Sequence, residues 1–257
     1  MSHLISTGES DPEPVNRPRP IIVHYHFFKN AGTSLDKTLI DNFGTTWTNY
    51  EHPTGSPIFK HDLERHLTSN PWITVLSSHT ALLPPPALPN SIVIPIFFLR
   101  HPIDRARSIY EFERLQTSDT EGARAAKEMN ISDFVRWRLS RTSDRSIRNF
   151  QVHRLSAAGH GSTELQRSKN ALSSLPFFGV VEEYTKSLSL LSKTLRRHFP
   201  QIALKNFHEN FTSSRNSALA EKLSRFKSSL DESAYKTLID ANNDDYDIWR
   251  FAMSRYK

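Results

Sequence analysis

The chain has 257 residues, 37% of them hydrophobic and 23% charged, which is enough for one domain with a sizeable core. Its 33 Lys and Arg against 27 Asp and Glu leave a net charge of +6, which suits an anionic ligand without specifying which one. The absence of cysteine excludes a disulfide framework and a thiolate zinc site. No apolar run approaches the roughly 18 residues that a membrane span needs, and no signal peptide is recognisable, which favours a cytoplasmic location.

Strands and helices are predicted to alternate along the chain. The first residues, 1–20, are polar and rich in proline, which predicts a flexible leader before a single domain over residues 21–257. Short apolar runs predict strands at residues 21–28, 72–77 and 91–99, with an irregularity at Pro95. Helical spacing of apolar residues predicts helices at residues 33–43, 58–67, 104–116, 131–150 and 188–198 and over most of the C-terminal third. Residues 44–57 are turn-rich, and residues 202–207 are predicted to form an edge strand. This alternation is typical of an α/β fold with a parallel sheet.

The stretch HYHFFKNAGTSLDKTL, residues 24–39, joins the first predicted strand to the first predicted helix. Such a turn lies at the carboxyl edge of a parallel sheet, where ligands bind, and the N–H groups of the helix start attract anions. Gly32 lets the backbone approach a ligand, Thr33 and Ser34 add hydroxyl donors, and Lys29 adds a positive charge. These features predict a phosphate or sulfate cradle, although the turn alone is also compatible with an ordinary loop carrying a solvated lysine.

The cradle is not a Walker A loop. That motif needs a glycine five residues before its second glycine and a lysine directly after it. With Gly32 as the second glycine, these positions fall on Phe27 and Thr33. The pattern therefore disfavours a nucleotide kinase or another phosphoryl transferase, which stays as the alternative enzyme class.

A second motif follows the most apolar predicted strand, in RHPIDRARSIYEFERL, residues 100–115. Arg100 lies at the carboxyl end of that strand, and Asp104 is a good residue type to begin the next helix. An arginine offers a planar fork to a phosphate, and Ser108, about one turn into the helix, adds a hydroxyl. Two neighbouring strand ends therefore each present an anion site, and a ligand with phosphate-like groups at both ends would bridge them.

The two motifs together resemble those of sulfotransferases. FFKNAGTSL is similar to their 5′-phosphosulfate loop, and FLRHPIDRARSIYEF is similar to their 3′-phosphate motif, in the same order and about 70 residues apart. The resemblance is closest to carbohydrate sulfotransferases of the heparan sulfate 2-O type and their bacterial relatives. It implies a P-loop-like three-layer fold, 3′-phosphoadenosine 5′-phosphosulfate (PAPS) as donor, 3′-phosphoadenosine 5′-phosphate (PAP) as product, and no required metal. The residues implied to hold the 5′ side are Lys29, Asn30, Ala31, Gly32, Thr33 and Ser34, and those implied to hold the 3′-phosphate are Arg100 and Ser108.

Weaker similarities extend over the rest of the chain. FFGVVEEY and NNDDYDIWRFA resemble further family segments, as does IRNFQVHRLSAAG. In the last of these, His153 occupies the arginine position of the family, and Arg154 follows one residue later.

Sulfuryl transfer needs a group that stabilises the leaving phosphate oxygen and a base for the acceptor hydroxyl. We assign the first role to Lys29 and expect a histidine in the second, because imidazole titrates near neutral pH. His79 follows a predicted strand that ends at the same sheet edge, and it matches the position of the catalytic histidine in relatives of the heparan sulfate 2-O type. The alternative is a loop histidine with structural hydrogen bonds only.

Two other groups of residues are open to more than one interpretation. His24 and His26 lie on the same side of a strand, where they could form a metal pair, but with no third ligand evident a role in the core or in support of the site is favoured. Four arginines would form one basic stripe on a continuous helix: Arg138, Arg141, Arg145 and Arg148. Ser143 and Asp144, however, are residue types that can break such a helix. A solvated face is the favoured interpretation, and an anionic saccharide site is the alternative.

The sequence thus predicts a sulfotransferase that moves the sulfuryl group of PAPS to a hydroxyl of a carbohydrate or glycosylated acceptor. We expect no nucleic-acid partner. The non-enzymatic alternative is a polyanion-binding protein, which would explain the basic charge but not the two strand-end motifs.

Overall fold

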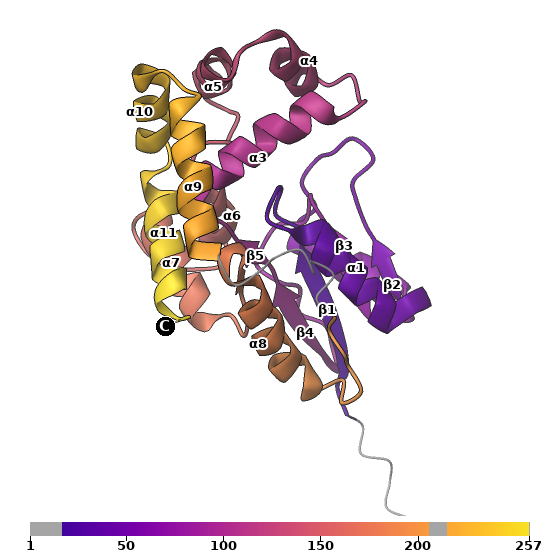
Figure 1. Ribbon diagram of the computed structural model, residues 1–257. Coiled ribbons are helices and arrows are strands. Elements are labelled where there is room, and N and C mark those ends of the chain that lie inside the picture. Colours follow the sequence, from indigo (N-terminus) through magenta and orange to yellow (C-terminus); the bar gives the residue numbers. More distant parts are fainter. Residues whose placement is uncertain (1–16, 206–214, 257) are drawn as a thin grey trace, which may run out of the picture.

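The computed structural model describes residues 17–205 and 215–256, and a parallel sheet with helices on both faces organises them (Figure 1). The strands β1 (Arg19–Tyr25), β2 (Trp47–Asn49), β3 (Val75–Ser78) and β4 (Ser91–Ile96) form one parallel sheet in the order β2-β3-β1-β4. In its centre, Ile22 of β1 pairs with Val75 on one side and Ile94 on the other. A second parallel pair joins β5 (Phe98–Leu99) to β6 (Gly179–Val180). The predicted α/β class with a central parallel sheet is confirmed.

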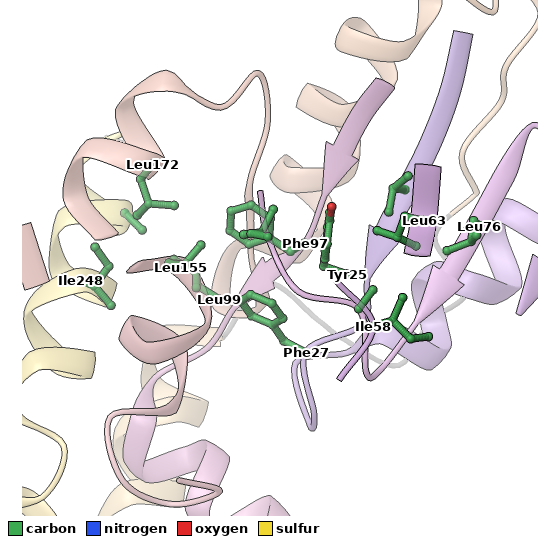
Figure 2. Packing of buried hydrophobic residues seen from close by; sticks show 14 of the residues in the cluster. Tyr25, Phe27, Ile58, Leu63, Leu76, Phe97, Leu99, Leu155, Leu172 and Ile248 are labelled. Carbon is green, nitrogen blue, oxygen red and sulfur yellow. The ribbon is translucent and has the colours of Figure 1, made fainter. Parts of the chain in front are cut away.

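Helices cover both faces of this sheet because β1 is apolar on both sides, as a central parallel strand requires. Side chains on one face of β1 pack against α2 (Lys60–Ser69), α6 (Phe150–Ser156), α7 (Glu164–Ser174) and α11 (Asn243–Ser254), in the cluster that includes Tyr25, Leu63, Leu155, Leu172 and Ile248 (Figure 2). On the opposite face, Ile22 packs against α1 (Gly32–Phe43) and α8 (Tyr184–Arg196), through residues such as Leu35, Leu39 and Leu188. The period of two along β1 therefore places His24 and His26 on the α1 side.

A helical subassembly lies beyond the carboxyl ends of the strands, at the top of Figure 1. It contains α3 (Pro102–Leu115), α4 (Glu121–Glu128), α5 (Ile131–Ser140), α9 (Arg215–Ser228) and α10 (Glu232–Asp240). Its own core joins Ile109, Leu139, Phe226 and Leu238. Short 3₁₀ turns, η1 (Gly44–Thr46) and η2 (Val181–Glu183), complete the described elements. No helix within residues 17–205 and 215–256 is long and apolar enough to cross a bilayer.

Several predicted boundaries differ from the structure. Arg19 and Pro20, assigned to the leader, already belong to β1, and residues 1–16 lie outside the described range. The strand predicted over 91–99 is interrupted at Phe97, two residues after Pro95. Pro95 belongs to the edge strand β4 and pairs with Val23 of β1, and a missing N–H is tolerated on an edge strand. The turn-rich segment 44–57 contains the short strand β2. Residues 202–205 form no strand, and 206–207 are not described.

The helix predicted over residues 131–150 is wrong in its second half. It ends at Ser140, and the next helix begins at Phe150. Between them, the Asp144 carboxylate accepts the backbone N–H of Ser146 at 2.8 Å. Such a local side-chain bond offers the backbone an alternative to the helix.

Candidate active site

The turn between β1 and α1 has an unusual backbone held by a buried amide. Lys29 and Ala31 both adopt φ of 62°, a left-handed conformation that is uncommon for residues other than glycine. Asn30 is 1% exposed, and its Nδ2 donates to the Phe98 carbonyl at 2.7 Å and to Gln151 Oε1 at 2.9 Å. The Asn30 side chain thus faces the interior and anchors the turn, while its neighbours remain nearer the surface.

Gly32 begins α1 in direct contact with a histidine. A Cβ at this position would lie 2.0 Å from His26 Cδ2, so no larger residue fits beside that ring. Thr33 is exposed and Ser34 is half-buried in the first helical turn, where backbone N–H groups have no acceptor within the helix. The geometry fits an anion at this helix start, approached closely because Gly32 has no side chain.

Arg100 brings the second motif to the first. Its Nη1 donates to the Lys29 carbonyl at 2.9 Å, and its Nε and Nη2 bind Asp104 at 2.8 and 2.6 Å. Burial opposes ionisation of Asp104, but Arg100 and Arg107 outweigh it and lower its pKa. Ser108 lies one helical turn beyond Asp104, and its hydroxyl has no hydrogen-bond partner within residues 17–205 and 215–256.

Lys29 is half-buried at the same junction. Its Nζ lies 4.4 Å from the centre of the Phe112 ring on α3. Burial and the neighbouring Arg100 lower its pKa, and Glu111 partly offsets them. Two cationic side chains therefore stand side by side, which favours an anion between the two motifs.

Gln151, at the start of α6, ties the two motifs together from below. Its Oε1 accepts from Asn30 Nδ2 and from the Arg100 backbone N–H, the latter at 2.8 Å, and its Nε2 donates to the Arg100 carbonyl at 2.9 Å. Gln151 itself is fully buried, and Asp245 of α11 accepts its backbone N–H at 3.1 Å. The segment IRNFQVHRL contained this residue, but nothing local in the sequence indicated its two partners.

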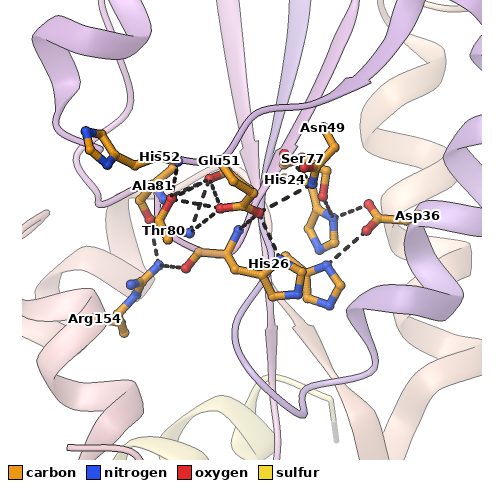
Figure 3. A network of polar contacts seen from close by, with 12 residues as sticks. His24, His26, Asp36, Asn49, Glu51, His52, Ser77, Thr80, Ala81 and Arg154 are labelled. Atoms are coloured by element: carbon orange, nitrogen blue, oxygen red, sulfur yellow. Dashed lines mark hydrogen bonds and ion pairs between the residues drawn. The ribbon is translucent and has the colours of Figure 1, made fainter. Parts of the chain in front are cut away.

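His79 directly follows β3 and pairs with a carboxylate. Its Nδ1 lies 2.9 Å from Glu51 Oε1, which also accepts the His79 backbone N–H at 2.6 Å (the network is drawn in Figure 3). Burial would raise the pKa of Glu51, but hydrogen bonds from His79 and Thr80 outweigh it and lower that pKa to about 2. With Nδ1 donating to an ionised Glu51, Nε2 of this 47% exposed imidazole carries the lone pair that a base needs.

Arg154 of α6 holds the loop that carries His79. Its Nη2 donates to the backbone carbonyls of His79 and Ala81 at 3.0 and 2.6 Å (Figure 3). Burial lowers the pKa of this arginine to about 10. His153, one residue earlier, is instead half-exposed beside Glu164, so Arg154 is the residue of this pair that reaches the site.

A family comparison decides the class of protein. The sulfotransferase family matches residues 15–252.

This chain belongs to the sulfotransferase family. It is also 33% identical over 249 residues to an uncharacterized protein of Archaeoglobus fulgidus, a match that spans 93% of this chain and 98% of that protein. The predicted membership is confirmed, and sulfuryl transfer is its general reaction. The similarity to the heparan sulfate 2-O type rests on the motifs alone.

In this sulfotransferase, three further side chains join His79 to the cradle. The His26 ring stacks on the His79 ring with centroids 3.8 Å apart, and the His24 ring lies 5.1 Å from His26. Asp36 of α1 binds His24 Nδ1 with one carboxylate oxygen at 2.7 Å and His26 Nδ1 with the other at 2.9 Å (Figure 3). Burial opposes ionisation of Asp36, but His24 and the hydrogen bonds from both rings hold its pKa well below the usual range.

The same three residues have the side-chain types of a metal site. Contrary to the expectation that no third ligand accompanies the histidines, Asp36 places an oxygen within 4.8 Å of both ligand nitrogens. The rings of His24 and His26, however, are inclined by only 21°. Their Nδ1 atoms both lie at hydrogen-bond distance from Asp36, one on each carboxylate oxygen. The arrangement instead matches two N–H donors bridged by one carboxylate, which we call the Asp36 clasp (His24, His26 and Asp36).

The four arginines from Arg138 to Arg148 do not form a basic stripe, because the helix that would align them ends at Ser140. Each has its own partner: Arg138 binds Glu113 and Asp144, Arg141 binds Glu121, Arg145 binds Glu164, and Arg148 donates to the Leu139 carbonyl. Neither a free solvated face nor a saccharide-binding row follows from these contacts.

Proposed function

We propose that this protein transfers the sulfuryl group of PAPS to a hydroxyl of a carbohydrate or glycosylated acceptor. The observation that carries the proposal is the junction of the two motifs, where Arg100 reaches the Lys29 carbonyl. A donor with anionic groups at its 5′ and 3′ positions needs two adjacent anion sites, and this junction supplies them.

Different residues at the junction bind the two anionic ends of the donor. The turn from Lys29 to Ser34 holds the 5′-phosphosulfate, with Ala31 and Gly32 shaping the backbone and Asn30 anchoring it from below. Arg100 and Ser108 hold the 3′-phosphate. Asp104 keeps the Arg100 fork in one orientation, because its carboxylate accepts two of the guanidinium N–H groups.

His79 serves as the base and Lys29 stabilises the leaving group. As the acceptor oxygen attacks sulfur, an oxygen–sulfur bond forms to the acceptor and the sulfur–oxygen bond to the 5′-phosphate breaks. The acceptor proton passes to Nε2 of His79, and Glu51 stabilises the resulting imidazolium through Nδ1. Lys29 offsets the negative charge on the departing phosphate of PAP. The sulfuryl group carries less charge than a transferred phosphoryl group, so no residue needs to hold a metal for this step.

Ligand-induced thermal shifts test the donor assignment. PAP should raise the melting temperature, since a ligand at 100 times its dissociation constant stabilises a fold by about 2.7 kcal/mol. AMP, which lacks the 3′-phosphate, and ATP with magnesium should have much smaller effects. A larger shift with ATP and magnesium would favour the phosphoryl-transferase alternative, and no shift with any nucleotide would remove the donor site. Transfer of radiolabelled sulfate from PAPS to a panel of polysaccharides then tests the acceptor class.

A further inference from the structure

His26 lies between the donor cradle and the base, yet the transfer reaction gives it no role. Its ring touches Gly32 of the cradle so closely that only glycine fits there, and it stacks on His79 at 3.8 Å with the planes inclined by 26°. The residue is 6% exposed and is held by Asp36 through Nδ1. A buried, hydrogen-bonded imidazole is thus fixed against the ring that must gain a proton.

The Asp36 clasp also determines the chemical form of His26. Burial lowers the pKa of His26 more than Asp36 raises it, so the ring is neutral near neutral pH. Because Asp36 accepts from Nδ1, the proton of this neutral ring resides on Nδ1. An N–H bound to a carboxylate gives electron density to its ring, and an electron-rich ring face attracts a cation lying above it.

We propose that His26 is a positioning residue that stabilises the protonated form of His79 through this stack, and that Asp36 holds it in the form able to do so. The proposal rests on the proposed function of His79 as the base. Glu51 acts in the plane of the His79 ring, at Nδ1, while His26 acts across its face. Protonation of His79 during transfer therefore places a positive charge between two groups that favour it.

The other charged groups near His79 come from several elements. Glu51 approaches from the segment after β2, and Asp36 acts from α1 through His26. Two groups act against a positive charge on His79: Arg154 of α6, which donates to the His79 carbonyl, and His24 of β1, which shares the carboxylate of Asp36 with His26. The two carboxylates thus offset a nearby guanidinium, and loss of either one should disfavour the imidazolium.

An NMR titration of the His79 ring tests the proposal without requiring activity. The signal is assigned by its loss in His79→Gln and followed in the wild type, in the isosteric Asp36→Asn and in His26→Leu, which removes the ring that stacks on His79. We expect the titration midpoint of His79 to move to lower pH by about half a unit or more in both variants, because the imidazolium loses a group that favours it. Asp41→Asn, an exposed change of equal charge on the same helix, should leave it in place. Unchanged midpoints in folded Asp36→Asn and His26→Leu would overturn the proposal.

Kinetics then separate this proposal from the proposed function. If His79 is the base, the acid limb of the kcat/KM profile should move with the NMR midpoint. The plateau in Asp36→Asn should fall by about threefold or less for a shift of half a unit, because the rate of general-base catalysis follows the basicity of the base. The PAP affinity should change much less. A loss of PAP affinity with an unmoved acid limb would reduce the clasp to a support for the cradle. A moved midpoint in a protein that transfers no sulfate would support the stack and contradict the proposed function.

Discussion

The two halves of the candidate site are built differently. On the donor side, Asn30 and Gln151 are almost fully buried and tie the cradle to Arg100 through side-chain hydrogen bonds. On the acceptor side, His79 is 47% exposed and its orientation depends on Glu51 and on the stack with His26. Under the proposed function, one donor molecule requires one preorganised geometry, whereas acceptors vary in shape, so the rigid half of the site is the half whose ligand does not vary.

The largest effect on turnover is expected at His79, the proposed base. His79→Ala should lower turnover by about 10²–10⁴, the usual contribution of a general base, while the PAP affinity stays within about twofold because the buried donor side is untouched. Steady-state rates and PAP titrations measure the two quantities. His153→Ala is a matched control, since His153 is 50% exposed and lies 3.3 Å from Glu164 in a similar pair. An equal loss in both variants, or a parallel loss of PAP affinity in His79→Ala, would contradict the role of His79.

At Gln151, the buried residue that joins Asn30 to Arg100, we expect the main loss to be in stability. Gln151→Met keeps the volume but leaves Asn30 Nδ2 with one partner fewer and the Arg100 backbone N–H and C=O without their side-chain partners. Buried groups left unpaired cost roughly 1–3 kcal/mol each, so the free energy of unfolding should fall by about 3 kcal/mol. Urea denaturation measures this change. Gln166→Met removes an exposed glutamine whose side-chain oxygen accepts from Ser162, and should cost less than about 0.5 kcal/mol. If both variants lose the same free energy of unfolding, the hydrogen bonds of Gln151 do not stabilise the donor side more than an exposed glutamine stabilises its surroundings.

A conservative substitution of Arg100 tests the proposed 3′-phosphate site while leaving Asn30 and Gln151 in place. Arg100→Lys keeps the charge but loses the fork that joins Asp104 to the Lys29 carbonyl. The PAP affinity should fall about 10- to 100-fold, corresponding to one charge-assisted hydrogen bond, while the weaker AMP affinity should change little. Isothermal titration with both nucleotides measures the difference. Arg107→Lys, which also contacts Asp104 but not the cradle, is the control. Equal losses for PAP and AMP would place the 3′-phosphate elsewhere.

The donor side was also the more predictable half from the sequence. The cradle and Arg100 each belong to a local strand–turn–helix segment, and the parallel topology brings their strand ends to one edge, so short patterns were sufficient to predict that the two motifs lie together. Glu51 was missed because it reaches His79 through β2, a three-residue strand too short to show a periodicity, paired with β3 from 28 residues away. Asp36 and Gln151 were missed for the same reason, since their partners are set by the packing of whole helices on the sheet. The interruption between α5 and α6 was indicated by Ser143 and Asp144, and the bond of Asp144 to Ser146 lies within it.

The smallest expected effect, at Glu51, is also the most specific to the acceptor side. The folded-state pKa of about 2 lies below the ordinary 4.5, so ionised Glu51 contributes stability above pH 4.5 and loses that contribution as the pH falls toward 2. Glu51→Gln removes one acceptor oxygen from a group that binds His79 and Thr80, and should unfold at lower urea than the wild type from pH 5 to 7. The difference should shrink between pH 4.5 and 2.5, because Glu51 of the unfolded wild-type chain then takes up a proton while the folded carboxylate stays ionised, which removes the contribution of its charge to stability. Glu128→Gln, an exposed change on α4, should match the wild type at every pH. A difference that persists undiminished at pH 2.5 would mean that Glu51 supports the His79 loop through its shape and not its charge. The exposed half of the site would then owe its order to neutral hydrogen bonds, as the proposed donor half does.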